Sequence, residues 1–232
     1  MKFQNGNNSR RGVMGIEAAL VLIAFVIVAA ALSFVVLNMG FSSTQQAKET
    51  VTKGIGEASS ALHVSGEVVS ATDVARSKAN ATQFPIKIVS GGSAVNLNAT
   101  LATVKFNTGR VQYDNILTKG CVLTSTTYTS LTAAMAAANT ASCLGGAAGN
   151  NPIGSPGTGP ATTKAVIYWT VQKNTNEILE PGEHANLVIV YSNADRPSPS
   201  QEVKAELILD SGAPVEFQRT MPPMTDKFTN MG

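Results

Sequence analysis

The longest apolar stretch of the sequence lies near its amino terminus, between Ala18 and Ala47. These thirty residues contain no Asp, Glu, Lys or Arg and consist mostly of Ala, Val, Leu, Ile and Phe. As an α-helix the stretch would be about 45 Å long, which is enough to cross the hydrocarbon core of a membrane. Because it is apolar on all sides, it suits burial either in lipid or among other helices. The pattern therefore argues against a soluble cytoplasmic monomer.

Beyond the apolar stretch, the helical pattern continues in a weaker form. Apolar residues keep a spacing of three or four, while charged residues such as Lys48 and Glu49 occupy other faces. The stripe consists of Ala47, Val51, Ile55, Ala58 and Leu62. Gly54 and Gly56 each weaken a helix by about 1 kcal/mol relative to Ala, so a bend is expected there. We predict one hydrophobic-to-amphipathic helix over residues 13–65.

Residues 66–232 follow a β pattern. Short segments of alternating or β-branched apolar residues are separated by turn signals such as Ser90-Gly91-Gly92 and Asp210-Ser211-Gly212. Seven or eight strands without long helices predict an antiparallel β-sandwich of the immunoglobulin-like kind, so the fold class is α+β. Ser130 to Ala141 is either a short helix or a surface insertion. The Gly- and Pro-rich run from Gly145 to Thr163 is predicted to be an exposed loop. The predicted strands are 84–89, 94–101, 104–106, 165–171, 187–191, 203–209 and 215–219.

Charge restricts the class of partner. The chain has 17 basic and 15 acidic residues, a formal net charge of +2. This balance gives no basic excess for a nucleic-acid surface, so we expect no nucleic-acid partner.

The first twelve residues are polar and basic, with Lys2, Arg10 and Arg11 and no acid. A secretory signal peptide would place its apolar stretch before the cleavage site and lose it on processing. Here the apolar stretch follows Gly12, so cleavage after Gly12 would keep it in the mature protein. The arginine pair favours an amino end in the cytoplasm, which puts everything after Asn38 outside.

The run RRGVMGIEAAL, from Arg10 to Leu20, resembles the class III signal region of type IV pilin-like proteins. Its continuation to Glu49, VLIAFVIVAAALSFVVLNMGFSSTQQAKE, is similar to archaeal flagellins (archaellins). Near the carboxyl end, Glu180-Pro181-Gly182-Glu183 and residues 212–223 resemble the closing strands of archaellin heads. The resemblance implies that a prepilin-like peptidase cuts between Gly12 and Val13. Residues 1–12 would then be a signal peptide, 13–65 the filament-core helix and 66–232 the outer head.

The resemblance also implies a function: a structural subunit of the archaellum, the archaeal swimming filament, outside the cell, with its precursor in the cell membrane. Its partners would be copies of itself, related archaellins, the signal peptidase, a membrane assembly platform and a motor ATPase, and the inner membrane before assembly. Two alternatives stay open. One is an archaeal type IV adhesion pilin, and the other is a membrane-anchored extracellular binding protein.

Several residues of the helix are predicted to make the assembly contacts. Small residues allow helix backbones to approach closely in apolar surroundings. Glu17 is costly in hydrocarbon unless it is paired, and the freed Val13 ammonium is the natural partner. Alternatively, Glu17 stays at the level of the lipid headgroups. The predicted assembly residues are Gly15, Glu17, Ala18, Leu20, Ile23, Phe25, Ile27 and Phe34.

Two further modifications are predicted for the head. Cys121 and Cys143 are the only cysteines, and outside a cell such a pair is expected to oxidise to a disulfide; two buried free thiols are the alternative. Asn80 and Asn98 each begin an Asn-Ala-Thr triplet and are candidate N-glycosylation sites.

Enzyme signatures are absent from the sequence. The two histidines, His63 and His184, lie in no metal-binding spacing, and no nucleophile elbow or nucleotide-binding loop occurs. Glu180, Glu183 and His184 are three possible metal ligands, but a turn at Pro181-Gly182 explains them more simply. We therefore predict no catalytic site, no cofactor and no metal, and not an enzyme.

Overall fold

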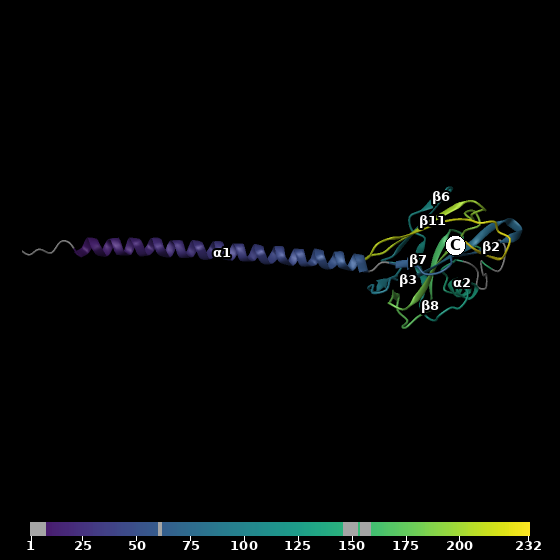
Figure 1. Cartoon of the computed structure of the whole chain (residues 1–232), viewed down its shortest axis with the longest axis horizontal. Coiled ribbons are helices and arrows are strands. Elements are labelled where there is room, and N and C mark those ends of the chain that lie inside the picture. Colours follow the sequence, from purple (N-terminus) through teal and green to yellow (C-terminus); the bar gives the residue numbers. More distant parts are fainter. Residues whose placement is uncertain (1–7, 60–61, 146–152, 154–158) are drawn as a thin grey trace, which may run out of the picture. The chain divides into compact units, whose positions relative to one another are not determined.

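The computed structural model describes residues 8–59, 62–145, 153 and 159–232. The chain divides between Gly54 and Ile55 into a helical unit and a β-rich unit. We call residues 62–232 the head (Figure 1).

The helical unit is a single long helix, α1, which spans Asn8–Ser59 and has 52 residues. At 1.5 Å per residue, α1 is about 78 Å long. It continues through Gly54 and Gly56, and it ends earlier than the sequence predicted. Leu62, which was predicted to lie on the helical stripe, belongs to a strand of the head and is only 6% exposed. The difference arises because Leu62, His63 and Val64 pair with Ile86–Ile88 of another strand.

The head contains a large sheet whose strands lie in the order β13-β2-β3-β10-β8-β7, with β1 also paired to β3. The central strand, β3, is the longest at 11 residues and pairs with β1 and β2 along one edge and with β10 along the other. The strand bounds are β1 Leu62–Val64, β2 Val69–Asp73, β3 Lys78–Ile88, β7 Leu117–Leu123, β8 Lys164–Val171, β10 His184–Val190 and β13 Phe228–Asn230.

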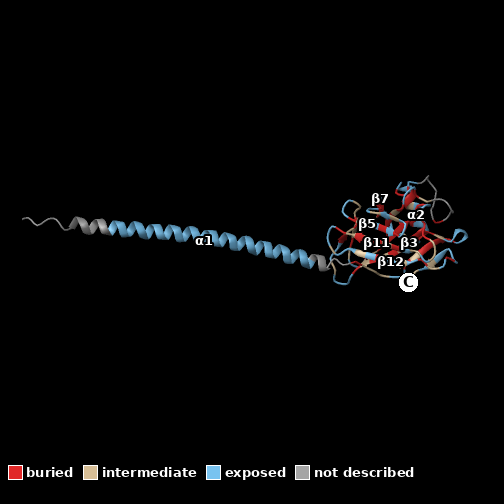
Figure 2. Cartoon of the chain, turned by 90° about the horizontal axis from the view of Figure 1, so that it is seen from above, coloured by how far each residue is buried: buried red, intermediate tan, exposed pale blue. Residues whose placement is uncertain are grey.

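A four-stranded sheet, in the order β12-β11-β5-β6, packs against the large sheet. Phe84 of the large sheet lies 4.8 Å from Phe217 of the smaller one, measured between ring centroids, and Phe106 lies 5.7 Å from Tyr191. Trp169 is fully buried, as expected for a core residue. Figure 2 shows the buried residues gathered within the head. The bounds are β5 Thr103–Thr108, β6 Val111–Tyr113, β11 Glu202–Ile208 and β12 Val215–Thr220, with a separate pair formed by β4 Val95–Asn96 and β9 Ile178–Leu179.

The predicted combination of a long helix and a β head rich in antiparallel strands is confirmed, with one difference in strand direction. β7 and β8 are parallel, whereas all other strand pairs in the described residues are antiparallel. A parallel pair needs a long crossover connection, and here it contains the helix α2, Leu131–Thr140. Of the two alternatives for Ser130 to Ala141, the structure shows the short helix, with Ser130 as its N-cap accepting a hydrogen bond from the Ala133 amide. Most of the predicted loop after Gly145 lies outside the described residues.

Candidate assembly surface

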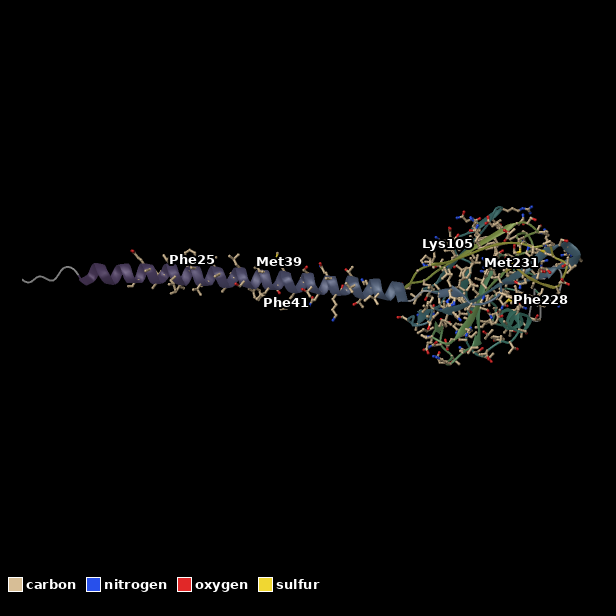
Figure 3. The ribbon with its side chains drawn as sticks, in the orientation of Figure 1. Phe25, Met39, Phe41, Lys105, Phe228 and Met231 are labelled. Atoms are coloured by element: carbon tan, nitrogen blue, oxygen red, sulfur yellow. A yellow bond between two sulfur atoms is a disulfide. The ribbon has the colours of Figure 1, made fainter. Side chains whose placement is uncertain are left out.

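The outstanding feature of α1 is an apolar surface without a partner. Every side chain described in α1, from Gly15 to Ile55, is exposed in the single chain. Phe25, Met39 and Phe41 project from the helix and are 74%, 69% and 66% exposed (Figure 3). The stretch from Gly15 to Ile55 is long and apolar enough to cross a membrane, and an 18-residue window within it has a mean hydropathy of 3.2. Soluble monomers rarely expose so large a continuous apolar surface, so α1 requires lipid or protein around it.

The predicted assembly residues all lie on α1 and all are exposed in the single chain. The helix places them on several faces rather than on one, so they form no single contact patch. The apolar residues among them are Leu20, Ile23, Phe25, Ile27 and Phe34, with exposures between 53% and 74%. At Gly15 an added Cβ would meet no atom within 4 Å, so no neighbour in this chain accounts for the glycine. Contacts on all faces are what a helix surrounded by other helices requires.

Charge on the described part of α1 is placed at its two ends. Glu17 is exposed near the amino end, and it is the only acid before Glu49. Further along, Gln45, Lys48, Glu49, Thr52 and Lys53 share one face. Ala47, Val51 and Ile55 form an exposed stripe on another side of the helix. The predicted amphipathic continuation is therefore present as far as Ile55.

The predicted cleavage site lies within α1 as well. Gly12 and Val13 belong to its first turns, because the helix begins at Asn8.

In the head, one of the three possible metal ligands, Glu183, stabilises the turn itself. Glu183 is 1% exposed, and its carboxylate accepts hydrogen bonds from the backbone amides of Lys173 at 2.7 Å and Glu180 at 2.9 Å. Gly182 has a φ of 89°, which a type II turn requires at this position. No group of three potential metal-binding side chains occurs in the described residues. The turn interpretation of Glu180, Glu183 and His184 therefore accounts for the geometry.

Cys121 and Cys143 form a disulfide bond, with their Cα atoms 5.0 Å apart. Cys121 lies in β7 and Cys143 follows α2, so the bond ties the end of the crossover helix to the edge of the large sheet. Leu131, Ala134, Met135 and Ala138 of α2 are buried. The bond thus holds α2 where its apolar face is covered.

The two candidate glycosylation sites differ in accessibility. Asn80 lies in β3 and is 4% exposed, so a glycan could be attached there only before the head folds. Asn98 lies in a loop after β4 and is half-buried. Its side-chain oxygen accepts hydrogen bonds from the amide and hydroxyl of Thr100, and its amide donates to Glu177. Asn98 is the better acceptor in the folded head.

A polar cluster that the sequence analysis did not identify joins both sheets. Asp195 accepts hydrogen bonds from the hydroxyls of Tyr113 in β6, Thr163 before β8 and Ser192 after β10, at 2.7–2.9 Å. Burial raises the pKa of Asp195, but these hydrogen bonds outweigh it and hold the pKa below its ordinary value. The neighbouring Arg196 is buried, with Nη1 3.9 Å from Asp73 of β2. Scattered single polar residues carry no periodic signal, which is why the pattern alone could not find them.

Known proteins resemble most of the chain. Residues 12–219 match the family model of archaeal-type flagellin. Probable flagellin 1 of Aeropyrum pernix is 47% identical over 106 residues, an alignment that covers 46% of this chain and about half (51%) of the relative. Probable flagellin 2 of Archaeoglobus fulgidus is 29% identical over 234 residues, covering 95% of this chain and 93% of the relative.

Two solved structures share the fold. The archaeal flagellum of Methanospirillum hungatei strain JF1 has a TM-score of 0.57 at 22% identity and covers 90% of this chain and 93% of that chain. Archaeal flagellin FlaB1 of Methanocaldococcus jannaschii has a TM-score of 0.56 at 17% identity, covering 73% and 95%. The family match extends over most of the residues of both the helix and the head. The chain therefore belongs to the archaeal-type flagellin family.

Proposed function

We propose that this chain is a structural subunit of an archaeal flagellum filament and that it polymerises through α1. The observation that carries the proposal is the exposed apolar surface of α1, from Ile16 to Phe41, in a chain of the flagellin family. A helix that is apolar on all faces needs neighbours on all faces. Copies of the same helix supply them in a filament core.

The proposed path begins in the cell membrane. The precursor is held by α1, and a prepilin-like peptidase removes residues 1–12, which makes Val13 the new amino terminus. The uncharged stretch of α1 then leaves lipid and packs among identical helices. One apolar environment replaces another, so the net change in hydrophobic free energy is small. The energy for extraction and rotation is supplied by a separate membrane platform and motor ATPase.

Glu17 has a specific task in this scheme. Its carboxylate lies close to the new amino terminus along the helix, and a charge in apolar surroundings requires a partner. We assign that partner to the Val13 ammonium, of the same chain or of a neighbour. Cleavage therefore creates the positive charge that makes burial of Glu17 tolerable.

The assembly is an open helix. Contacts between one surface of a subunit and a different surface of the next repeat without closing, so a filament rather than a ring results. The role of the chain is mechanical: helices form the core and the heads form the outer, extracellular surface. The head is held by its core and by the disulfide, and Asn98 is the position that we assign to glycosylation.

A strain that lacks this chain tests the proposed function. We expect it to lose filaments and swimming while surface attachment stays normal, and expression of the chain should restore swimming. Normal swimming with lost attachment would identify an adhesion pilin instead. An unprocessed, detergent-soluble monomer as the only form in wild-type cells would identify a membrane-anchored binding protein.

Glycopeptide mapping tests the modification. We expect a glycan at Asn98 and an unmodified Asn80. Modification of Asn80 alone would contradict the assignment from accessibility.

A further inference from the structure

The carboxyl-terminal residues form an edge strand that lies outside the region matched by the family model, which ends at residue 219. This strand, β13, has three residues and pairs antiparallel with β2, with Thr229 opposite Ser70. The pairing is extended at both ends, because the Met231 amide donates to Val68 at 2.8 Å and the Thr72 amide donates to Lys227 at 2.9 Å.

Main-chain hydrogen bonds attach β13, together with a hydrogen bond from the buried Thr72 hydroxyl to the Asp226 carbonyl. Phe228 is 45% exposed, and Lys227 and Asn230 are also exposed. Met231 is partly buried against the core and is the main apolar contact of this segment (Figure 3). Main-chain pairing depends little on sequence. If β13 detached, the edge of β2 would therefore accept another extended strand.

The edge of β2, which β13 covers, is more prone to pairing with another chain than the outer edge of β13. β2 has five residues, Val69–Asp73, and four of them are buried on the adjoining faces. A longer edge strand presents more unpaired backbone groups and is a better template for pairing with another chain, and in β2 only the last residue, Asp73, is charged. β13 replaces it with an edge of three residues, beside which Lys227 Nζ lies 6.0 Å from the centroid of the Phe228 ring. Short strands and lysines are features that discourage further pairing.

We propose that β13 covers the β2 edge and thereby prevents heads of neighbouring copies from joining edge to edge. The occupant of the uncovered edge would be a second copy of this chain. The inference rests on the proposed function in one respect: a filament holds identical heads at high local concentration, which favours such pairing.

The ladder geometry supplies a matched pair of variants. In antiparallel strands, residues alternate between facing the partner strand and facing away from it. The bonds of Lys227 and Met231 to β2 therefore place the amide of Thr229 toward β2 and that of Phe228 away from it. Thr229→Pro removes a ladder hydrogen bond, whereas Phe228→Pro removes an amide that makes none, and proline is tolerated at such edge positions.

Filaments are purified from strains that carry each variant as the sole copy, and lateral association is measured by low-speed sedimentation and negative-stain microscopy. We expect Thr229→Pro filaments to bundle several-fold more than wild-type filaments, and Phe228→Pro filaments to stay dispersed. A peptide of residues 225–232, added in trans, should disperse the Thr229→Pro bundles, whereas the same peptide with proline in place of Thr229 should not.

Hydrogen exchange at Thr72, measured on the subunits after filaments are dissociated in detergent, reports directly whether β13 is detached. Dispersed Thr229→Pro filaments in which the Thr72 amide exchanges rapidly would overturn the inference. Loss of filaments in Thr229→Pro but not in Phe228→Pro would also overturn it, because the tail would then be needed for assembly rather than for protection. Failure of the wild-type chain to form filaments would instead refute the proposed function, and the two failures are therefore distinguishable.

Discussion

At the scale of single residues, Asp195 connects separate segments of the head. One carboxylate oxygen accepts hydrogen bonds from three hydroxyls that come from β6, the start of β8 and the end of β10. Hydrogen bonds to charged groups are stronger than those between neutral groups. The cluster therefore links the two sheets at a position where apolar packing alone would not fix their register.

We expect Asp195→Asn to lower the free energy of unfolding by about 1–3 kcal/mol, because the three hydroxyls lose a charged acceptor. Denaturant unfolding of the full chain in detergent, followed by tryptophan fluorescence of the single Trp169, measures the change. Asp210→Asn is the control, since Asp210 is exposed. Equal stability of the two variants would show that the cluster contributes nothing.

The carboxylate of Asp195 also makes the stability of the head depend on pH. Because the pKa of Asp195 in the folded head lies below the ordinary value of 3.8, its charge stabilises the head at all pH values well above 3.8. The contribution is lost as the pH falls through the folded-state pKa. We expect the stability difference between wild type and Asp195→Asn to be constant near neutral pH and to shrink in acid. A difference that grows below pH 4 would mean that the pKa is raised instead.

At the scale of elements, the long helix and the strands with clear alternation could be predicted from the sequence. Strands β8, β10, β11 and β12 lie close to their predicted positions, because β8 and β10 contain continuous apolar runs and β11 and β12 alternate apolar with polar residues. The short strands β1, β2, β6, β9 and β13 were not predicted. They carry two to five residues each, and their pairing is decided by partners far away in the sequence.

Strand β7 and its parallel direction were not predicted, for a related reason. Its segment, Leu117–Leu123, contains Lys119 and Gly120 and has no clean alternation, and its direction depends on the crossover through α2. The residues of the candidate site also divide into those that could be predicted from the sequence and those that could not. The helix residues could be identified because their apolar run is continuous, whereas the Asp195 cluster assembles from four separate segments.

The disulfide belongs to this scale, since it fixes α2 to β7. We expect the double substitution Cys121→Ser and Cys143→Ser to lower stability by about 3 kcal/mol, because the bond closes a loop with a sequence separation of 22 residues. Thermal unfolding of the two proteins measures the loss. Mass spectrometry with and without reductant checks the premise, and two free thiols in native filaments would contradict it.

At the scale of the whole molecule, the head has its own core, whereas the described side chains of α1 remain exposed. The helix is therefore incomplete without other copies or lipid. Membrane insertion and filament assembly both require apolar surroundings on every face of α1. One sequence can satisfy both, because the transfer exchanges lipid for protein.

This reasoning predicts that a charge in the middle of α1 blocks assembly. Ile27→Lys places an ammonium in apolar surroundings, at a cost of about 2.5–3.5 kcal/mol per subunit. We expect it to abolish sheared filaments, with precursor still detectable in membranes by immunoblot. Thr52→Lys adds the same charge on the face that already carries Lys48 and Lys53, and it should assemble normally. Normal filaments from Ile27→Lys would argue against a filament core that excludes water.

The most direct test of the central claim is a cryo-electron microscopy reconstruction of filaments sheared from cells. We predict that density for this chain begins at Val13 and that α1 lies at the filament axis, with Phe25, Ile27 and Phe34 enclosed by helices of neighbouring copies. A filament in which α1 faces solvent, or in which residues 1–12 remain attached, would contradict the account.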